Sequence, residues 1–286
     1  LQRAALLEKM LMACKSTVFY LQKIVWPTEL SVLYPYVGSI GLTNPDFLWP
    51  ALSVITLFII AFLSLRRTRA VFFGIFFFLI TISPTFLNFA KGEMDLYFAS
   101  DRYAYAGSIG IFFLIALGLS QLMQKLSPKI VTGGVGVVIL LFAFMAHTQS
   151  QTWRNTETLF GNVIEHYPNS HVAHNNLGNI YRRQDYLEKS IEHYEQAIAI
   201  NDHPRTRSNL GAALRKQGQI EEAFAQYDRA LELNADSKNA HFGLGIIYAE
   251  QGNRVQALQE YQRAIEIDPT YSEVYLNLGA LHMQMQ

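Results

Sequence analysis

Long stretches of apolar residues dominate the first half of the chain. Four of them, at 48–65, 70–89, 107–123 and 130–147, contain no Lys, Arg, Asp or Glu. A helix needs roughly 17–25 apolar residues to cross the hydrocarbon core of a bilayer. The pattern therefore predicts about four transmembrane helices in a membrane domain at 27–148.

Residues 1–26 show a different pattern, with apolar and charged positions at helical spacing. Lysines 9, 15 and 23 lie on the face opposite the apolar positions, and Trp26-Pro27 is expected to end the helix. This spacing predicts an amphipathic helix in the membrane interface, or alternatively a tilted span with snorkelling lysines. Its predicted apolar face consists of Leu6, Leu7, Met10, Leu11, Cys14, Val18, Leu21 and Val25.

The second half of the chain repeats itself. The pair Leu-Gly recurs at 177, 210, 244 and 278, and a small residue followed by Tyr and Ala recurs in the intervals. A period of about 34 residues is that of the tetratricopeptide repeat, a pair of antiparallel helices that stacks into a superhelix. We expect Gly178, Gly211 and Gly245 to allow close helix approach, with the recurrent aromatic residues filling the gaps. The predicted fold class is all-α, with polytopic membrane helices followed by a tetratricopeptide-repeat superhelix.

Two helices without a mate frame these repeats. Residues 149–170 are predicted to form a linker and a helix that covers the first repeat. Repeats occupy 171–286, three of them complete, and the fourth consists of one helix at 272–285. We expect Leu278 and Leu281 of that helix to lack a covering neighbour, and the natural chain to continue.

Charge divides the chain in the same place as hydropathy. Residues 1–150 contain 11 Lys and Arg and 6 Asp and Glu, which leaves 12 and 17 of the totals of 23 for the remainder. Arg66, Arg67, Arg69, Lys125 and Lys129 occupy two of the turns between spans, and such turns face the cytoplasm. The repeats are then predicted to be extracytoplasmic, in a periplasm or lumen, on an integral membrane protein.

Soluble catalytic chemistry has no recognisable motif in the sequence. There is no phosphate-binding glycine loop or Cys/His cluster, and Cys14 is a single cysteine. His171 and His174 share a helix face, but His174 and His241 occupy repeat positions that usually hold packing residues. We therefore expect no metal site, and no cofactor is evident.

The first helices of the repeats offer a candidate binding surface. Asn176, Asn209 and Asn277 are equivalent by the repeat period, and Gly243 interrupts the series. A side-chain amide both donates to and accepts from a peptide backbone. The series is similar to the asparagine ladder with which repeats of O-GlcNAc transferases hold extended polypeptide. The alternative is that Asn is simply a common residue at this repeat position.

A charged pair precedes the third span. Asp101 and Arg102 are followed by Tyr103 and Tyr105. Charged side chains at a membrane edge usually face a cavity or partner, and a guanidinium held by a carboxylate is well shaped for a phosphate. The alternative is an interfacial ion pair with the tyrosines as membrane anchors. On the residues alone, both interpretations stay open.

Three segments together resemble a known family. They are FYLQKIVWPTELSVLYPY at 19–36, SDRYAYAGS at 100–108 and TWRNTETLF at 152–160. Their order resembles that of the transmembrane and tetratricopeptide-repeat protein O-mannosyltransferases and their bacterial relatives. The family motif commonly reads Glu-Arg-Tyr where this chain has Asp101, Arg102 and Tyr103.

The resemblance implies glycosyl transfer from a polyprenyl-phosphate sugar, with Arg102, Asp101, Tyr103 and Tyr105 near the donor phosphate. It also implies a polypeptide acceptor on the repeats, and no nucleic-acid partner is expected. In this family the catalytic acidic residue lies in a first outer loop, which we expect to lie upstream of residue 1. The alternative function is a non-catalytic, membrane-anchored scaffold for protein binding.

Overall fold

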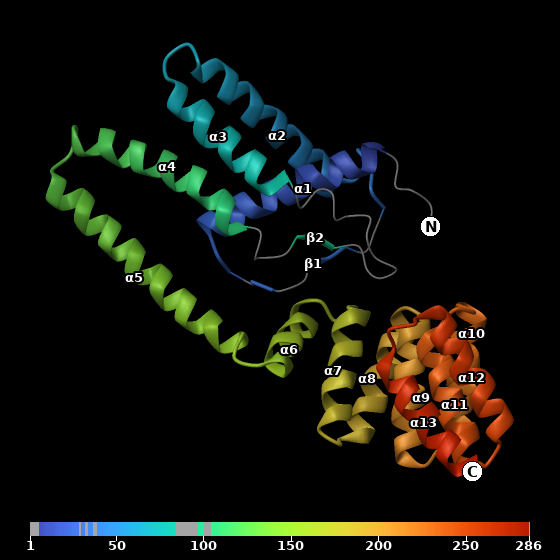
Figure 1. Cartoon of the computed structure of the whole chain (residues 1–286). Helices are drawn as coiled ribbons and strands as arrows, with labels where there is room; N and C mark the ends of the chain where they lie inside the picture. Colours follow the sequence, from blue (N-terminus) through green and yellow to red (C-terminus); the bar gives the residue numbers. More distant parts are fainter. Residues whose placement is uncertain are drawn as a thin grey trace. The chain divides into compact units, whose positions relative to one another are not determined.

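The computed structural model describes residues 6–28, 30–31, 34–36, 39–83, 97–99 and 104–285. The chain divides into two compact bodies, 1–168 and 169–286 (Figure 1). The first contains α1 (Leu6–Val25), β1 (Tyr34–Pro35), α2 (Pro45–Ser64), α3 (Arg69–Ile82), β2 (Tyr97–Ala99), α4 (Ala104–Met123), α5 (Pro128–Thr152) and α6 (Thr156–His166). The all-α class is confirmed, with one two-stranded ladder added to it.

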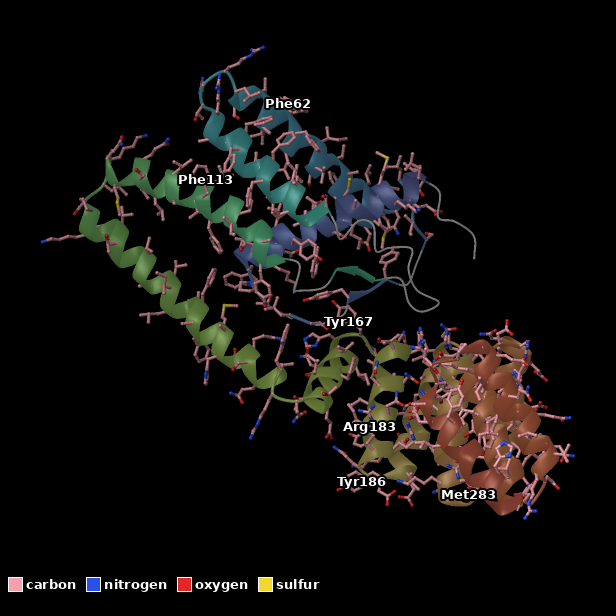
Figure 2. All side chains as sticks on the ribbon, viewed as in Figure 1. Phe62, Phe113, Tyr167, Arg183, Tyr186 and Met283 are labelled. Atoms are coloured by element: carbon pink, nitrogen blue, oxygen red, sulfur yellow. The ribbon has the colours of Figure 1, made fainter. Side chains whose placement is uncertain are left out.

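The apolar stretches form long helices. Among the described residues, α2, α4 and α5 are long and apolar enough to cross a membrane, and α3 is a shorter apolar helix of 14 residues. The last six residues of the apolar stretch predicted at 70–89, residues 84–89, lie outside the described residues. Phe62 on α2 and Phe113 on α4 are exposed aromatic side chains that would face lipid (Figure 2). The structure thus describes an integral membrane body.

Helices α3 and α4 pack at very short range. A Cβ added to Gly110 would lie 2.5 Å from the carbonyl oxygen of Gly74, and one added to Gly74 would lie 2.5 Å from Leu114. Small residues allow such close backbone approach between membrane helices, where packing replaces the hydrophobic effect as the main attraction. Gly74 and Gly110 therefore hold this helix pair together.

Helix α1 crosses the end of the bundle at which α2 begins and α3 ends (Figure 1). It forms over the predicted residues, but it buries a different face. Leu11, Met12, Ser16, Thr17, Tyr20 and Ile24 are buried. Of the predicted apolar face, only Leu11 belongs to this set, while Leu6, Leu7, Met10 and Val25 are exposed. The hydroxyl groups of Ser16 and Thr17 can be buried on this face because they donate to the carbonyls of Met12 and Ala13 (3.0 and 2.8 Å).

The second body consists of helix pairs in the predicted register. They are α7 (His171–Arg183) with α8 (Leu187–Ile200), α9 (Pro204–Gln217) with α10 (Ile220–Leu233), and α11 (Lys238–Glu250) with α12 (Arg254–Ile267), followed by α13 (Ser272–Met285). In each pair the glycine of the first helix faces a buried tyrosine of the second. A Cβ at Gly178 or Gly245 would lie 2.5 Å from Tyr194 or Tyr261, respectively. The predicted role of these glycines is confirmed.

The expectation for α13 was wrong in its details. Leu281 is 2% exposed and packs with Ala257, Tyr261 and Ala264 of α12, and Leu278 is partly buried against the same cluster. The exposed apolar side chains are instead Leu276 and Met283, each 74% exposed (Figure 2). The helix therefore turns Leu278 of its Leu-Gly pair and the following Leu281 inward.

Candidate functional site

The end of the membrane body at which α1 lies brings together segments that are distant in sequence. Strand β1 pairs antiparallel with β2, with Tyr34 opposite Ala99 and Pro35 opposite Tyr97. The side-chain amide of Gln149, near the end of α5, donates to the carbonyl of Leu30 (2.9 Å). The loop after α1, the strand before α4 and the end of α5 therefore meet at one end of this body.

Aromatic packing fixes the position of β1. Tyr34 is fully buried, its ring lies 4.5 Å from that of Phe19 and 5.9 Å from that of Tyr167, and its hydroxyl accepts from the backbone N–H of Ser31 (2.6 Å). Edge-on contacts of this kind stabilise aromatic pairs beyond the area that they bury. The ladder of β1 with β2 thereby holds the first family-like segment, 19–36, beside residues 97–99, which come just before the second one.

The predicted phosphate-binding residues are only partly described. Asp101, Arg102 and Tyr103 lie outside the described residues. Tyr105 is in the first turn of α4 and is 67% exposed. The elements on either side of the segment, β2 ending at Ala99 and α4 beginning at Ala104, both lie at this end of the body (Figure 1).

A second charged pair at this end was missed from the sequence. The ammonium of Lys15 on α1 lies 3.0 Å from a carboxylate oxygen of Asp46, in the first turn of α2. It also lies 4.8 Å from the ring centre of Tyr36 and 5.2 Å from that of Phe47. Lys15 was assigned to a solvated face, and the only sequence signal for the pair was an acidic residue directly after the Asn44-Pro45 helix start. The pair ties α1 to α2.

The three predicted asparagines all lie on first helices, and each amide is occupied within the chain. Asn176 and Asn277 donate to backbone carbonyls four residues earlier, those of Val172 and Glu273 (2.8 and 2.9 Å). Asn209 donates instead to the side chain of Asn175 in the preceding repeat (2.9 Å). A bound peptide would have to exchange with these local acceptors.

The interruption at Gly243 has a steric cause. A Cβ at this position would lie 2.2 Å from the ring of Tyr227, which is buried between Gly211 and Gly243. Carbon atoms in contact are normally about 3.5–4.0 Å apart. The position is therefore taken by packing between the second and third repeats, which excludes an asparagine there.

Two polar side chains pair at one recurring position between the two helices of each repeat, and the first and third of these pairs contain histidines. Nδ1 of His174 lies 3.1 Å from Nδ1 of His193, and the equivalent pairs are Arg207 with Gln226 (2.7 Å) and His241 with Glu260 (2.6 Å). His171 instead contacts Asn201 (3.2 Å), so His171 and His174 have different partners. Within the part of the chain that the structure describes, no three His, Cys, Asp or Glu side chains converge as metal ligands.

The environment shifts the pKa values of two of these histidines in opposite directions. Burial, and next the charge of His174, lower the pKa of His193. Burial also acts to lower the pKa of His241, but the hydrogen bonds to Glu260 and to the carbonyl of Ala235 outweigh it, so that this pKa is raised. The equivalent side-chain pairs of the first and third repeats thus contain one histidine that resists protonation, His193, and one that favours it, His241.

Comparison with known proteins agrees with this architecture. The tetratricopeptide repeat family matches residues 171–204, and a further tetratricopeptide repeat description matches 211–252 and 247–286. The fold and these matches define a membrane protein with tetratricopeptide repeats. Among solved structures, the chain is similar to that of MamA, 22% identical over 45% of this chain and 76% of that one, with a TM-score of 0.39.

The chain is also similar to curated relatives, and the longer of two such matches extends beyond the repeats into the membrane body. The chain is 26% identical over 187 residues to the human protein O-mannosyl-transferase TMTC1, and 23% identical over 104 residues to Tmtc3 of Drosophila melanogaster. The first match covers 60% of this chain and 20% of the relative, and the second covers 35% and 11%. The chain therefore spans about a fifth of the human relative. The family resemblance predicted from the sequence is confirmed.

Proposed function

We propose that this chain is part of a membrane glycosyltransferase that uses a polyprenyl-phosphate sugar, with protein O-mannosylation as the reaction. The observation that carries the proposal is the similarity to TMTC1, a protein O-mannosyl-transferase by name, over 187 aligned residues. That match covers 60% of this chain, which is slightly more than the larger of the two bodies, so it includes residues from both bodies. The scaffold function is the alternative, since repeats also anchor binding surfaces to membranes.

In this proposal Arg102 binds the donor phosphate. A guanidinium makes a planar, two-pronged contact with phosphate oxygens, and Asp101 would orient it. Support comes from the described elements on either side, because β2 and the start of α4 both lie where α1, β1 and the end of α5 meet. Tyr103 and Tyr105 would complete the donor site as aromatic neighbours at the membrane edge.

The acceptor polypeptide is assigned to the repeats. Asn176, Asn209 and Asn277 would exchange their local hydrogen bonds for the backbone of an extended segment. Repeats and donor site must then share one side of the membrane, and the arginines and lysines of the two opposite turns favour the extracytoplasmic side.

Replacement of Arg102 by lysine in the natural protein tests the donor site. An ammonium keeps the charge but loses the two-pronged geometry, and loss of one charge-assisted hydrogen bond costs about 1.5–3 kcal/mol, roughly ten- to a hundredfold in rate or donor affinity. Arg66→Lys, in the opposite turn, is the matched control and should transfer sugar at the normal rate. The assay is mannose transfer from a polyprenyl-phosphate donor to a polypeptide at equal expression. Normal transfer by Arg102→Lys would favour the scaffold function.

A further inference from the structure

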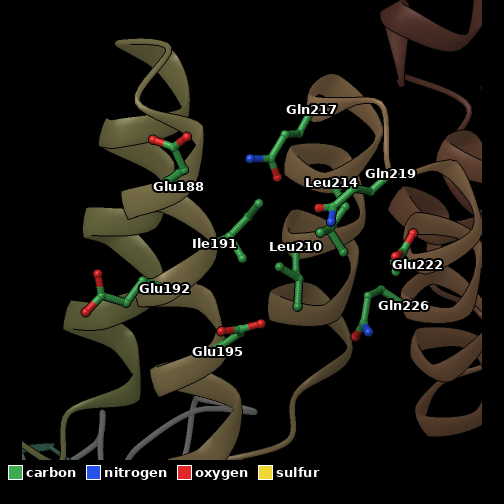
Figure 3. Close-up of a pocket in the computed structure, with 10 residues that line it drawn as sticks. All are labelled: Glu188, Ile191, Glu192, Glu195, Leu210, Leu214, Gln217, Gln219, Glu222 and Gln226. Atoms are coloured by element: carbon green, nitrogen blue, oxygen red, sulfur yellow. The ribbon is translucent and has the colours of Figure 1, made fainter.

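A groove in the repeats has a strongly acidic lining that the proposed function does not use. It encloses about 430 Å³ between α8 and α10, with α9 at its floor (Figure 3). Three carboxylates line the α8 side and one lines the α10 side, namely Glu188, Glu192, Glu195 and Glu222. The size is that of sites that hold small ligands or a few side chains of a partner.

The carboxylates on α8 form a row. Glu188, Glu192 and Glu195 are spaced by four and three residues, which places them on one face of the helix. At a rise of 1.5 Å per residue this row is about 10 Å long. Ile191, between them in sequence, and Leu210 and Leu214 on α9 give the groove an apolar floor. The lining thus combines negative charge with an apolar strip.

Several other acidic side chains of the repeats are paired with arginine. Asp202, Asp236 and Glu250 each lie within 3.1 Å of an arginine guanidinium. In contrast, none of the four groove carboxylates forms an ion pair in the described part of the chain. Glu192 accepts a hydrogen bond from the side-chain amide of Gln196 (3.3 Å), and the groove lining contains no Lys or Arg. Like charges about 5–6 Å apart on one helix face repel each other, and a cationic partner removes that repulsion.

We propose that this groove binds a cationic segment of polypeptide. Lysine or arginine side chains of the segment would contact Glu188, Glu192 and Glu195, and an apolar side chain would cover Ile191. Charge complementarity selects the occupant, since the second half of the chain has 17 Asp and Glu against 12 Lys and Arg and a second copy of the repeats would be repelled. The site is independent of the donor site and of the three asparagines.

The test uses the full chain in nanodiscs of zwitterionic lipid and a fluorescent peptide of alternating lysine and leucine. Fluorescence anisotropy at about 0.15 M salt measures binding, so that only short-range charge contacts contribute strongly. We expect Glu188→Gln with Glu195→Gln to weaken binding about tenfold, the product of two partly desolvated ion pairs. The matched control is Glu221→Gln with Asp228→Asn, which removes two negative charges from exposed positions outside the lining.

The outcomes separate the proposal from general charge attraction. The control variant should bind within about twofold of the unmodified chain, whereas equal weakening by both variants would overturn the proposal. So would unchanged binding by Glu188→Gln with Glu195→Gln, provided that circular dichroism shows an unaltered fold. Asn176→Ala with Asn209→Ala should leave binding unchanged, and a loss there would mean that the peptide occupies the asparagine surface instead.

Discussion

Replacement of Gly243 by alanine is the most direct test of the packing between repeats. Tyr227 is 2% exposed, and burial raises its pKa to about 12. Its ring lies between Gly211 and Gly243, where an added Cβ would be 2.9 and 2.2 Å from ring atoms, respectively. Since carbon contacts require about 3.5 Å, the ring would have to withdraw by more than 1 Å from Gly243. Gly211 blocks that movement.

The expected effect follows from two opposing contributions. Alanine in place of glycine inside a helix normally stabilises by roughly 0.5–1 kcal/mol. Overpacking of a buried site costs about 1–3 kcal/mol, and the short distance here places Gly243 at the upper end. We therefore expect Gly243→Ala to reduce the free energy of unfolding of the repeats by about 1–2 kcal/mol.

Gly279→Ala is the matched control, because Gly279 lies within α13 and nothing surrounds its added Cβ within 4 Å. That variant should gain about 0.5–1 kcal/mol. Urea unfolding of residues 152–286, followed by circular dichroism, compares the two. In a Tyr227→Leu background the penalty of Gly243→Ala should become smaller by at least about 1 kcal/mol. Equal stability of Gly243→Ala and Gly279→Ala would refute the steric explanation.

Three further predictions concern backbone strain, pH and topology. Asp185 has a φ of +67° at the turn position where the next two repeats have Gly218 and Gly252, also with positive φ. Because this left-handed conformation is unfavourable for residues other than glycine, Asp185→Gly should raise the unfolding free energy by about 0.5–1 kcal/mol in the same urea assay. Because the pKa of His193 is lowered in the folded state, the unfolded state binds more protons as pH falls below about 6.5, and stability should fall from there; His193→Gln should flatten that fall in thermal scans at pH 5–7. The raised pKa of His241 acts in the opposite direction, since its contribution is full below about 6.5 and is lost as pH rises, so Glu260→Gln should steepen the acid-side loss. Gln251→Cys, an exposed position, in a Cys14→Ser background should react with an impermeant maleimide in intact cells, and labelling only after lysis would exclude extracytoplasmic repeats.

The repeats were predictable from the sequence because the same residue types recur at equivalent positions in successive repeats. The Leu-Gly pairs and the recurrent tyrosines fixed the register of α7 to α12, and even α13 follows this pattern with Leu281 inward. Gly243 was predicted only as a gap in the asparagine series. Its cause lies in Tyr227 of the neighbouring repeat, and hydrophobic periodicity contains no information about such a contact.

The membrane body was predictable in its helices and less so in its contacts. Periodicity identified an apolar face on α1, but in lipid an apolar face need not be the one that packs against protein. The packing row Met12, Ser16, Tyr20 and Ile24 instead places small and aromatic side chains against α2 and α3. The ladder of β1 with β2 and the pair of Lys15 with Asp46 join residues more than 30 positions apart, and no local pattern indicates them.

Because of the contacts in the membrane body, the segments at its α1 end must all lie on the same side of the membrane. Asp46 at the start of α2, Ile82 at the end of α3 and Gln149 near the end of α5 all belong to the end where α1 lies. The turns with Arg66, Arg67, Lys125 and Lys129 connect the other helix ends, so these cations lie away from the α1 end (Figure 1). On α1 and at the start of α2, the three lysines 9, 15 and 23 are nearly offset by Glu8 and Asp46, whereas the two turns contain five cations and no carboxylate, so the excess of positive charge lies on the turns. Because positively charged turns stay in the cytoplasm, the ladder of β1 with β2, the start of α4 and the exit of α5 toward the repeats are expected on the other side as one unit. A result that places the repeats in the cytoplasm would therefore move the segment of Arg102 there with them, and the donor-phosphate proposal would have to be made for the cytoplasmic leaflet.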